Sequence, residues 1–253
     1  MDERVAIVTG AGSGIGAATA RLLASRGMTV ALVARNGNAL ESVAATIRDD
    51  DEGAAHVLPT DLAEPDAPAE LVRRVLELEG RVDVIVNNAA AFALAPFDQA
   101  SAEDFDRHMA VNLRAPFFLV QASLPALRLS PAPAVVNVSS AAAVMYRTGQ
   151  AVYALTKAAL EHLTKQLAYE LAPDGIRVNA VRPGPTDTPI HRAAADPEER
   201  LRLLGELTPL GRVGLPHEIA RWVWYLVDEE ADWVTGTVIS VDGGRVLGPP
   251  DRS

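Results

Sequence analysis

The sequence predicts an α/β fold in which a doubly wound, seven-stranded parallel sheet carries helices on both faces. Short β-branched segments alternate with longer helical segments along the chain. The strand-like segments are apolar throughout, which is typical of strands that helices cover on both faces. Such regular alternation implies right-handed β-α-β units. No change in composition divides the 253 residues, so we predict a single domain over residues 1–253.

Each expected element follows from its composition and from the residues that flank it. Strands are expected at residues 5–9, 29–34, 56–59, 82–86, 134–138, 176–181 and 237–241. Helices are expected at residues 15–26, 38–48, 65–79, 151–171 and 216–227, with helical stretches from 102 towards 129. Gly27 and Pro173 end two of these helices, and Pro65 and Pro216 begin two others. The connection 183–208 is long, polar and charged, which predicts a substrate lid.

The charge balance and the lack of cysteine exclude several classes of function. Lys and Arg total 23 against 33 Asp and Glu, so the net charge is -10. Nucleic acids and anionic membranes need a basic surface, so neither is expected as a partner. Without cysteine there is no disulfide, which fits a reducing cytoplasm, and the first residues lack the pattern of a signal peptide. We therefore expect a cytoplasmic protein. Its five histidines do not cluster, so no metal site is expected.

A glycine-rich turn joins the first strand to its helix, in the order Thr9-Gly10-Ala11-Gly12-Ser13-Gly14-Ile15-Gly16. Glycine lets the backbone turn tightly and approach a pyrophosphate, whose charge the N-terminus of the helix stabilises. A glycine-rich turn alone is weak evidence, but a strand, this turn and a helix in succession form the context that a dinucleotide site requires. The segment therefore predicts a Rossmann fold with a bound dinucleotide.

The end of the second strand indicates which dinucleotide binds. A site for NAD usually has a carboxylate about 20 residues after the glycines, where it binds the ribose 2′-hydroxyl. This chain has Ala34, Arg35 and Asn36 in that region. A guanidinium suits a 2′-phosphate, so NADP is favoured and NAD remains possible. The alternative is that Arg35 is only a solvated surface charge.

Tyr153 and Lys157 lie one turn apart in an expected helix, so they share one of its faces. A free phenol has a pKa of about 10, which is too high for an efficient acid and base near neutrality. A neighbouring ammonium favours the phenolate and is expected to lower that pKa. Ser139 and Ser140 follow the fifth strand at the same edge of the sheet. The pair therefore predicts acid/base chemistry by Tyr153.

Together with the glycine turn, these residues resemble the short-chain dehydrogenase/reductase family from residue 5 to about residue 244. Further matches follow in order: Asp61-Leu62, Asn87-Asn88-Ala89, Val111-Asn112, the segment 183–188, the segment 212–220 and Asp242-Gly243-Gly244. The chain departs from the family pattern at two positions. Ala90 replaces a usual glycine, and Thr186 stands where an aliphatic residue is more common.

The resemblance implies a role for each catalytic candidate. Tyr153 passes a proton to the substrate oxygen during reduction and removes it during oxidation. Lys157 holds the nicotinamide ribose and depresses the pKa of the tyrosine. Ser140 hydrogen-bonds the carbonyl oxygen, with Ser139 as the alternative. Asn112 supports a water relay from Lys157 to solvent.

The same resemblance implies a set of dinucleotide contacts along the sheet edge. In the phosphate turn they are Gly10, Ser13, Gly14, Ile15 and Gly16. Arg35 and Asn36 lie near the adenosine ribose, and Asp61 and Leu62 border the adenine. Asn88 and Ala89 lie on the ribose side, and Pro183, Gly184, Thr186 and Thr188 lie towards the nicotinamide. The resemblance also implies a homotetramer, or a homodimer, built on the 102–129 and 151–171 helices and the last strand.

We therefore expect an NAD(P)(H)-dependent oxidoreductase that interconverts a small-molecule ketone and a secondary alcohol by hydride transfer. One alternative is a 3-oxoacyl carrier-protein reductase, although Arg128 stands alone where an acidic carrier needs a basic cluster. A second is a non-catalytic dinucleotide sensor or scaffold, since a fold alone does not establish chemistry. Arg192, Arg200 and Arg202 in the candidate lid either meet an anionic substrate or are solvated.

Overall fold

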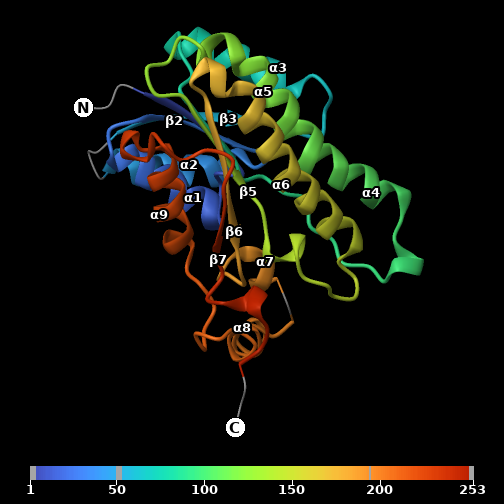
Figure 1. The fold of residues 1–253 in the computed structure, drawn as a ribbon. Coiled ribbons are helices and arrows are strands. Elements are labelled where there is room, and N and C mark those ends of the chain that lie inside the picture. The colour runs from blue at the N-terminus through green and yellow to red at the C-terminus, as the bar shows by residue number, and fades with distance from the viewer. Residues whose placement is uncertain (1–3, 50–52, 194, 251–253) are drawn as a thin grey trace.

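The computed structural model describes residues 4–49, 53–193 and 195–250. In these ranges one parallel sheet has the strand order β3-β2-β1-β4-β5-β6-β7. The strands are β1 (Val5–Thr9), β2 (Thr29–Ala34), β3 (Ala54–Pro59), β4 (Val84–Asn87), β5 (Ala134–Val138), β6 (Arg177–Pro183) and β7 (Val238–Val241). The expected doubly wound, seven-stranded Rossmann fold is confirmed (Figure 1). Residues 1–3, on which the expectation about a signal peptide partly rests, lie outside the described ranges.

Helices cover both faces of this sheet (Figure 1). They are α1 (Gly14–Ser25), α2 (Gly37–Asp49), α3 (Ala67–Glu79), α4 (Ala102–Met109), α5 (Ala115–Leu127), α6 (Ala151–Leu171), α7 (Pro189–Arg192), α8 (Pro197–Glu206) and α9 (Pro216–Val227). Apolar side chains of α1, α2 and α9 form one buried cluster with the sheet, and those of α3, α5 and α6 form the other. None of the helices in the described part is long and apolar enough to cross a membrane.

Two segments differ from the expected elements. The helical stretch from 102 is divided by a single π-helical turn, Ala110–Arg114, which contains Asn112. π-Helical turns are rare and often occur at functional sites. The expected lid is not a plain loop, because it contains α7 and α8 beyond the carboxyl ends of β6 and β7 (Figure 1). Asp196 caps α8 by accepting a hydrogen bond from the Glu199 N–H at 3.0 Å.

The strand order changes direction between β1 and β4. From β1 the chain continues outwards through β2 and β3, and it then crosses to β4 on the other side of β1. Ligands of doubly wound sheets bind at such a switch point, beyond the carboxyl ends of the strands. Here the two strand ends are tied together, because the Asn88 and Ala89 N–H groups donate to the Thr9 Oγ1 at 2.9 and 3.0 Å. The glycine turn and the segment after β4 therefore share one edge.

Gly16 is expected to be intolerant of any side chain. A Cβ added there would lie 2.2 Å from the Gly10 carbonyl oxygen and 2.5 Å from the Asn88 amide nitrogen. We expect Gly16→Ala to lower the free energy of unfolding by about 1–3 kcal/mol, as overpacked sites do, and to weaken dinucleotide binding. Thermal unfolding and dinucleotide titration measure the two effects.

Gly214→Ala is the matched control, because an added Cβ there meets its nearest atom at 3.6 Å, an ordinary contact. This control should change the free energy of unfolding by less than about 0.5 kcal/mol. A Gly16→Ala protein with the stability of the control would contradict the close approach of helix and turn.

Candidate active site

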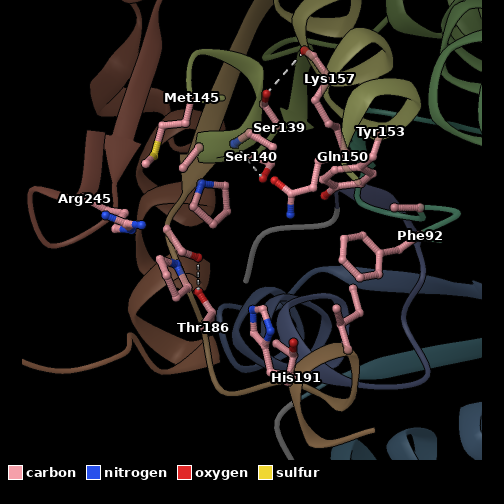
Figure 2. A pocket seen from close by; sticks show the side chains of 18 of the residues that line it. Phe92, Ser139, Ser140, Met145, Gln150, Tyr153, Lys157, Thr186, His191 and Arg245 are labelled. Atoms are coloured by element: carbon pink, nitrogen blue, oxygen red, sulfur yellow. Dashed lines mark hydrogen bonds between the residues drawn. The ribbon is translucent and has the colours of Figure 1, made fainter. Parts of the chain in front are cut away.

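One cavity of about 340 Å³ lies beyond the carboxyl ends of the strands and collects about half of the predicted site residues. Its predicted members are Ile15, Asn88, Ser139, Ser140, Tyr153, Lys157, Pro183, Gly184, Thr186 and Thr188. The structure thus brings together segments from four strand ends and from α6. Figure 2 shows Ser140, Tyr153 and Lys157 on one side of this cavity and His191 on the other.

Tyr153 is held by aromatic contacts and by burial on α6. Only 8% of it is exposed, and its ring meets the Phe92 ring edge-on, with centroids 5.0 Å apart. Burial raises the pKa of the phenol, and a hydrogen bond with the Ser140 side chain opposes this rise. The side chains of Tyr153 and Ser140 therefore interact directly, and burial favours the neutral phenol.

Lys157 is fully enclosed at the base of the same cavity. Its exposed fraction is 1%, and its Nζ donates to the Val138 carbonyl oxygen at 2.8 Å. Burial lowers the pKa of Lys157 to about 8, although the Glu161 carboxylate opposes this shift. The Nζ lies 5.8 Å from the centroid of the Tyr153 ring. The expectation that this ammonium lowers the pKa of Tyr153 is wrong for this structure, because burial disfavours the charged form of both groups.

The two adjacent serines have different environments. The Ser139 Oγ donates to the Glu161 carboxylate at 2.7 Å, and Arg182 binds the same carboxylate at 2.6 and 2.8 Å. This buried network engages the Ser139 hydroxyl. The Ser140 Oγ accepts from the Ala142 N–H at 3.2 Å, which leaves its own proton for another acceptor.

Asn112 has a structural position behind the cavity rather than in its lining. Its Oδ1 accepts from the Ala91 N–H at 2.7 Å, and its Nδ2 donates to the Ala91 carbonyl oxygen and to the Thr156 Oγ1 at 3.1 and 3.0 Å. These three bonds join the segment after β4 to α6. They also fix the segment that carries Phe92 against Tyr153.

His108 lies four residues before Asn112 and also fixes the segment after β4 by a hydrogen bond. The sequence analysis missed this role. It considered the five histidines only as metal ligands, but His108 is buried, with 2% of it exposed. Its Nδ1 bonds the Asp104 carbonyl oxygen at 2.6 Å, and its Nε2 accepts from the Ala93 N–H at 3.2 Å. Its ring centroid lies 6.4 Å from that of Tyr153. The spacing of four residues between His108 and Asn112 was the available signal.

The glycine turn presents an open helix N-terminus at one end of the cavity. Gly10 and Gly14 have positive φ angles of 66° and 53°, which side chains rarely adopt. Ser13 is exposed, and its side chain makes no capping hydrogen bond to α1. A Cβ on Gly14 would lie 3.1 Å from the Thr188 methyl group, so the segment after β6 packs directly on this turn.

The residues predicted for the adenine end lie outside the cavity. Arg35 and Asn36 are exposed at the end of β2, and the Arg35 guanidinium makes no hydrogen bond or salt bridge to the described residues. Asp61 is bound by the Arg107 guanidinium at 3.1 Å. The Leu62 side chain is buried in the core cluster of α3 and α5, so it presents little surface to a ligand.

Known proteins are similar to this chain in both sequence and fold. The family described as enoyl-(acyl carrier protein) reductase matches residues 10–245. A 3-oxoacyl-(acyl-carrier-protein) reductase from Thermotoga maritima is 36% identical, over 98% of this chain and 99% of the relative. A cyclopentanol dehydrogenase from Comamonas sp. is 35% identical, over 96% of this chain and 97% of the relative. The chain is a short-chain dehydrogenase/reductase.

A solved structure of this family extends the comparison to a cofactor. A putative NAD(P)-dependent gluconate 5-dehydrogenase from Beutenbergia cavernae, which holds NADP at low occupancy, has a TM-score of 0.89 and 34% identity. The alignment covers 96% of this chain and 97% of that structure. As a short-chain dehydrogenase/reductase, the protein is an oxidoreductase that uses a nicotinamide dinucleotide and acts on alcohol or ketone groups of small molecules.

Proposed function

We propose that the enzyme interconverts a ketone and a secondary alcohol, that it prefers NADP, and that Tyr153 is its acid and base. One observation carries the proposal: the Tyr153, Ser140 and Lys157 side chains line the same cavity as Ile15 of the glycine turn. One cavity can therefore hold both the oxygen of the substrate and the dinucleotide.

The residues of the turn fit a dinucleotide. The atoms around Gly16 leave no room for a Cβ, so helix α1 approaches the end of β1 closely. The N–H groups of the first turn of α1 have no partner within the helix, and they point towards a ligand at its N-terminus. The exposed Ser13 hydroxyl adds a donor at the same place. These features support a pyrophosphate at the turn.

The chain's own groups then account for the proton chemistry. When bound, the nicotinamide supplies or accepts the hydride. Tyr153 donates its phenolic proton to the carbonyl oxygen during reduction and recovers it during oxidation. Burial favours the neutral phenol, which is the form that donates. The Ser140 hydroxyl hydrogen-bonds the same oxygen and stabilises the charge that develops on it. Because the Ser139 hydroxyl is engaged by Glu161, Ser140 is preferred for this role.

Lys157 and Asn112 support this proton transfer. A pKa of about 8 keeps Lys157 mostly protonated at neutral pH and still able to exchange a proton. Its ammonium is proposed to hold the nicotinamide ribose. The Asn112 side chain is fully engaged with Ala91 and Thr156. We therefore propose that Asn112 takes part in a water relay through its main-chain carbonyl oxygen.

Arg35 is proposed to bind the 2′-phosphate of NADP. It is exposed at the end of β2, and its guanidinium has no hydrogen bond or salt bridge among the described residues. We expect Arg35→Ala to raise the KM for NADPH by about tenfold or more and to leave that for NADH within about threefold, since a charge-assisted hydrogen bond contributes about 1.5–3 kcal/mol. Steady-state kinetics with both cofactors measure this.

Arg48→Ala is the control for this prediction, because Arg48 is an exposed arginine on α2 whose only ion pair within the described ranges is with Glu41, at 3.6 Å. It should leave both KM values unaltered. Equal losses with NADPH and NADH in the Arg35 variant would overturn the assignment of the 2′-phosphate.

A 3-oxoacyl carrier-protein reductase is the second candidate, favoured by the relative from Thermotoga maritima. It requires a basic surface for an acidic carrier. The structure weakens this candidate, because the Arg128 Nε bonds the Asp174 carboxylate at 2.8 Å and the single expected docking charge is neutralised. Turnover of a 3-oxoacyl carrier protein more efficient than that of the free 3-oxoacyl thioester would favour it.

We also propose that the enzyme is a cytoplasmic homotetramer or homodimer. Large apolar side chains lie exposed on the outer faces of α5 and α6, where Phe117 and Phe118 are each 42% exposed and Tyr169 is 83% exposed. Their burial between subunits supports these helices as an interface. Light scattering on the purified protein tests the assembly.

A further inference from the structure

The cavity is lined by basic residues although the chain as a whole is acidic. The protein carries a net charge of -10, yet the residues that line the cavity include neither aspartate nor glutamate. They do include Arg147, His191 and Arg245 besides Lys157. A basic cavity in an acidic protein concentrates anions locally.

These basic side chains come from three separate segments and lie close enough to act on one another. Arg147 precedes α6, His191 lies on α7, and Arg245 follows β7. Burial lowers the pKa of Arg147, and so do the charges of Arg200 and Arg245. Burial likewise lowers the pKa of His191, as do the charges of Arg200 and Arg147. We call Arg147, His191, Arg200 and Arg245 the basic cluster.

The basic cluster lacks a counter-ion among the described residues. The side chains of Arg147 and Arg200 make no salt bridge there, and Arg245 donates only to the Leu207 carbonyl oxygen, at 2.9 Å. Asp187 faces His191, but both of its carboxylate oxygens are bound by Arg192, at 2.5 and 2.6 Å. The like charges of Arg147, Arg200 and Arg245, held together without a partner, cost free energy, which a bound anion offsets.

The other lid arginines behave differently. Arg192 pairs with Asp187 and Glu198, and Arg202 pairs with Glu199 and Glu206. Of the three lid arginines that the sequence suggested for an anionic substrate, Arg200 alone acts electrostatically on residues that line the cavity. Arg192 and Arg202 are neutralised at the surface, so they provide matched controls.

We propose that the basic cluster binds an anionic group, a carboxylate or a phosphate, carried by the ketone or alcohol substrate. This inference rests on the proposed function. Figure 2 shows His191 across the cavity from Ser140 and Tyr153, and Arg245 on the side of the cavity opposite Phe92. A substrate whose carbonyl oxygen lies at Tyr153 and Ser140 therefore extends its far end towards the cluster. The substrates are anionic ketones such as oxo acids.

Matched pairs of substrates test this proposal by kinetics. The acids 4-oxopentanoate, 5-oxohexanoate and 4-oxocyclohexanecarboxylate are compared with their methyl esters, and dihydroxyacetone phosphate is compared with dihydroxyacetone. We expect kcat/KM for at least one anion to exceed that for its neutral partner by about tenfold or more. A charge-assisted hydrogen bond contributes a factor of this size. The acids and the phosphate separate the two possible groups.

Variants then test whether the basic cluster causes the preference for anionic substrates. Arg147→Ala should lower kcat/KM for the preferred anion about tenfold more than for its neutral partner, chiefly through KM. Arg245→Ala should act in the same direction. Arg192→Ala and Arg202→Ala should leave the preference between anion and neutral partner intact. Neutral substrates turned over as well as their anions, or an anion preference that survives in Arg147→Ala, would overturn the proposal.

Calorimetry separates this proposal from the proposed reaction. Cyclohexanecarboxylate has no ketone, so its binding needs no chemistry. We expect the wild-type enzyme to bind it about tenfold more tightly than the Arg147→Ala/Arg245→Ala double variant. Equal binding would contradict the anion site even in an active enzyme. If no ketone in the panel is reduced, the proposed function fails, and the calorimetric comparison still decides whether the cluster binds anions.

Discussion

Replacing Tyr153 by Phe is expected to lower kcat by about 10²–10⁴-fold, the usual contribution of a positioned proton donor. The change removes only the phenolic oxygen. The ring that contacts Phe92 and His108 remains, so the packing of α6 against the segment after β4 is retained. Ketone reduction in steady state, followed by the absorbance of the reduced nicotinamide, measures the loss.

Binding and stability are the controls for Tyr153→Phe. The variant should take up the reduced dinucleotide with nearly the affinity of the wild type, since the glycine turn and Arg35 are untouched. Its thermal unfolding midpoint should stay close to that of the wild type, because the ring keeps its contacts with Phe92 and His108. Near-normal turnover in the variant would refute Tyr153 as the acid and base.

Replacing Lys157 by Met is expected to lower kcat/KM by about 10²-fold or more and yet to stabilise the fold at neutral pH. Lys157 is fully buried, and its pKa is lowered from 10.5 to about 8. At 1.36 kcal/mol per pKa unit, the folded protein bears a cost of about 3 kcal/mol for holding the ammonium. Losing the bond to the Val138 carbonyl costs about 1 kcal/mol. The variant should therefore gain about 2 kcal/mol at pH 7.

The pH dependence gives this prediction a definite sign. Between pH 8 and 10.5 the unfolded wild-type chain binds more protons at Lys157 than the folded chain does. The free energy of unfolding of the wild type therefore gains a positive contribution from this group over that window. The advantage of Lys157→Met is full below pH 8, shrinks across the window and is reversed above 10.5, where only the lost bond to the Val138 carbonyl remains. Denaturant titrations of both proteins at pH 7, 8, 9 and 10 measure the difference, and a constant difference would contradict the lowered pKa.

The fold was predictable from the sequence because it depends on local patterns. Apolar β-branched runs such as 134–138 predicted strands within three residues of their observed ends, and glycines marked the phosphate turn. The seven parallel strands then follow from the handedness of β-α-β units. Helices α7 and α8 were missed because the charged surface of this segment gave little apolar periodicity. Their starts at Pro189 and Pro197 were the local signal.

The site was predictable where one segment carries the signal, and it was not where several segments meet. Tyr153 and Lys157 share a helix face, so their pairing was evident, but their burial was not, and burial reversed the expected shift in the pKa of Tyr153. The buried bonds of His108 depend on the path of the chain after β4. Similarly, Arg147 and Arg245 lie far apart in sequence, and only the fold shows that they line one cavity.

Hydride transfer is the central claim, and isotope labelling tests it most directly. The enzyme is incubated in ordinary water with NADPH that carries deuterium at both hydrogen positions of C4 of the nicotinamide, together with a ketone from the panel above. The product alcohol is then analysed by mass spectrometry. The account predicts one deuterium on the carbinol carbon, from one face of the nicotinamide, and a hydroxyl proton from solvent. An alcohol formed without that deuterium would contradict it.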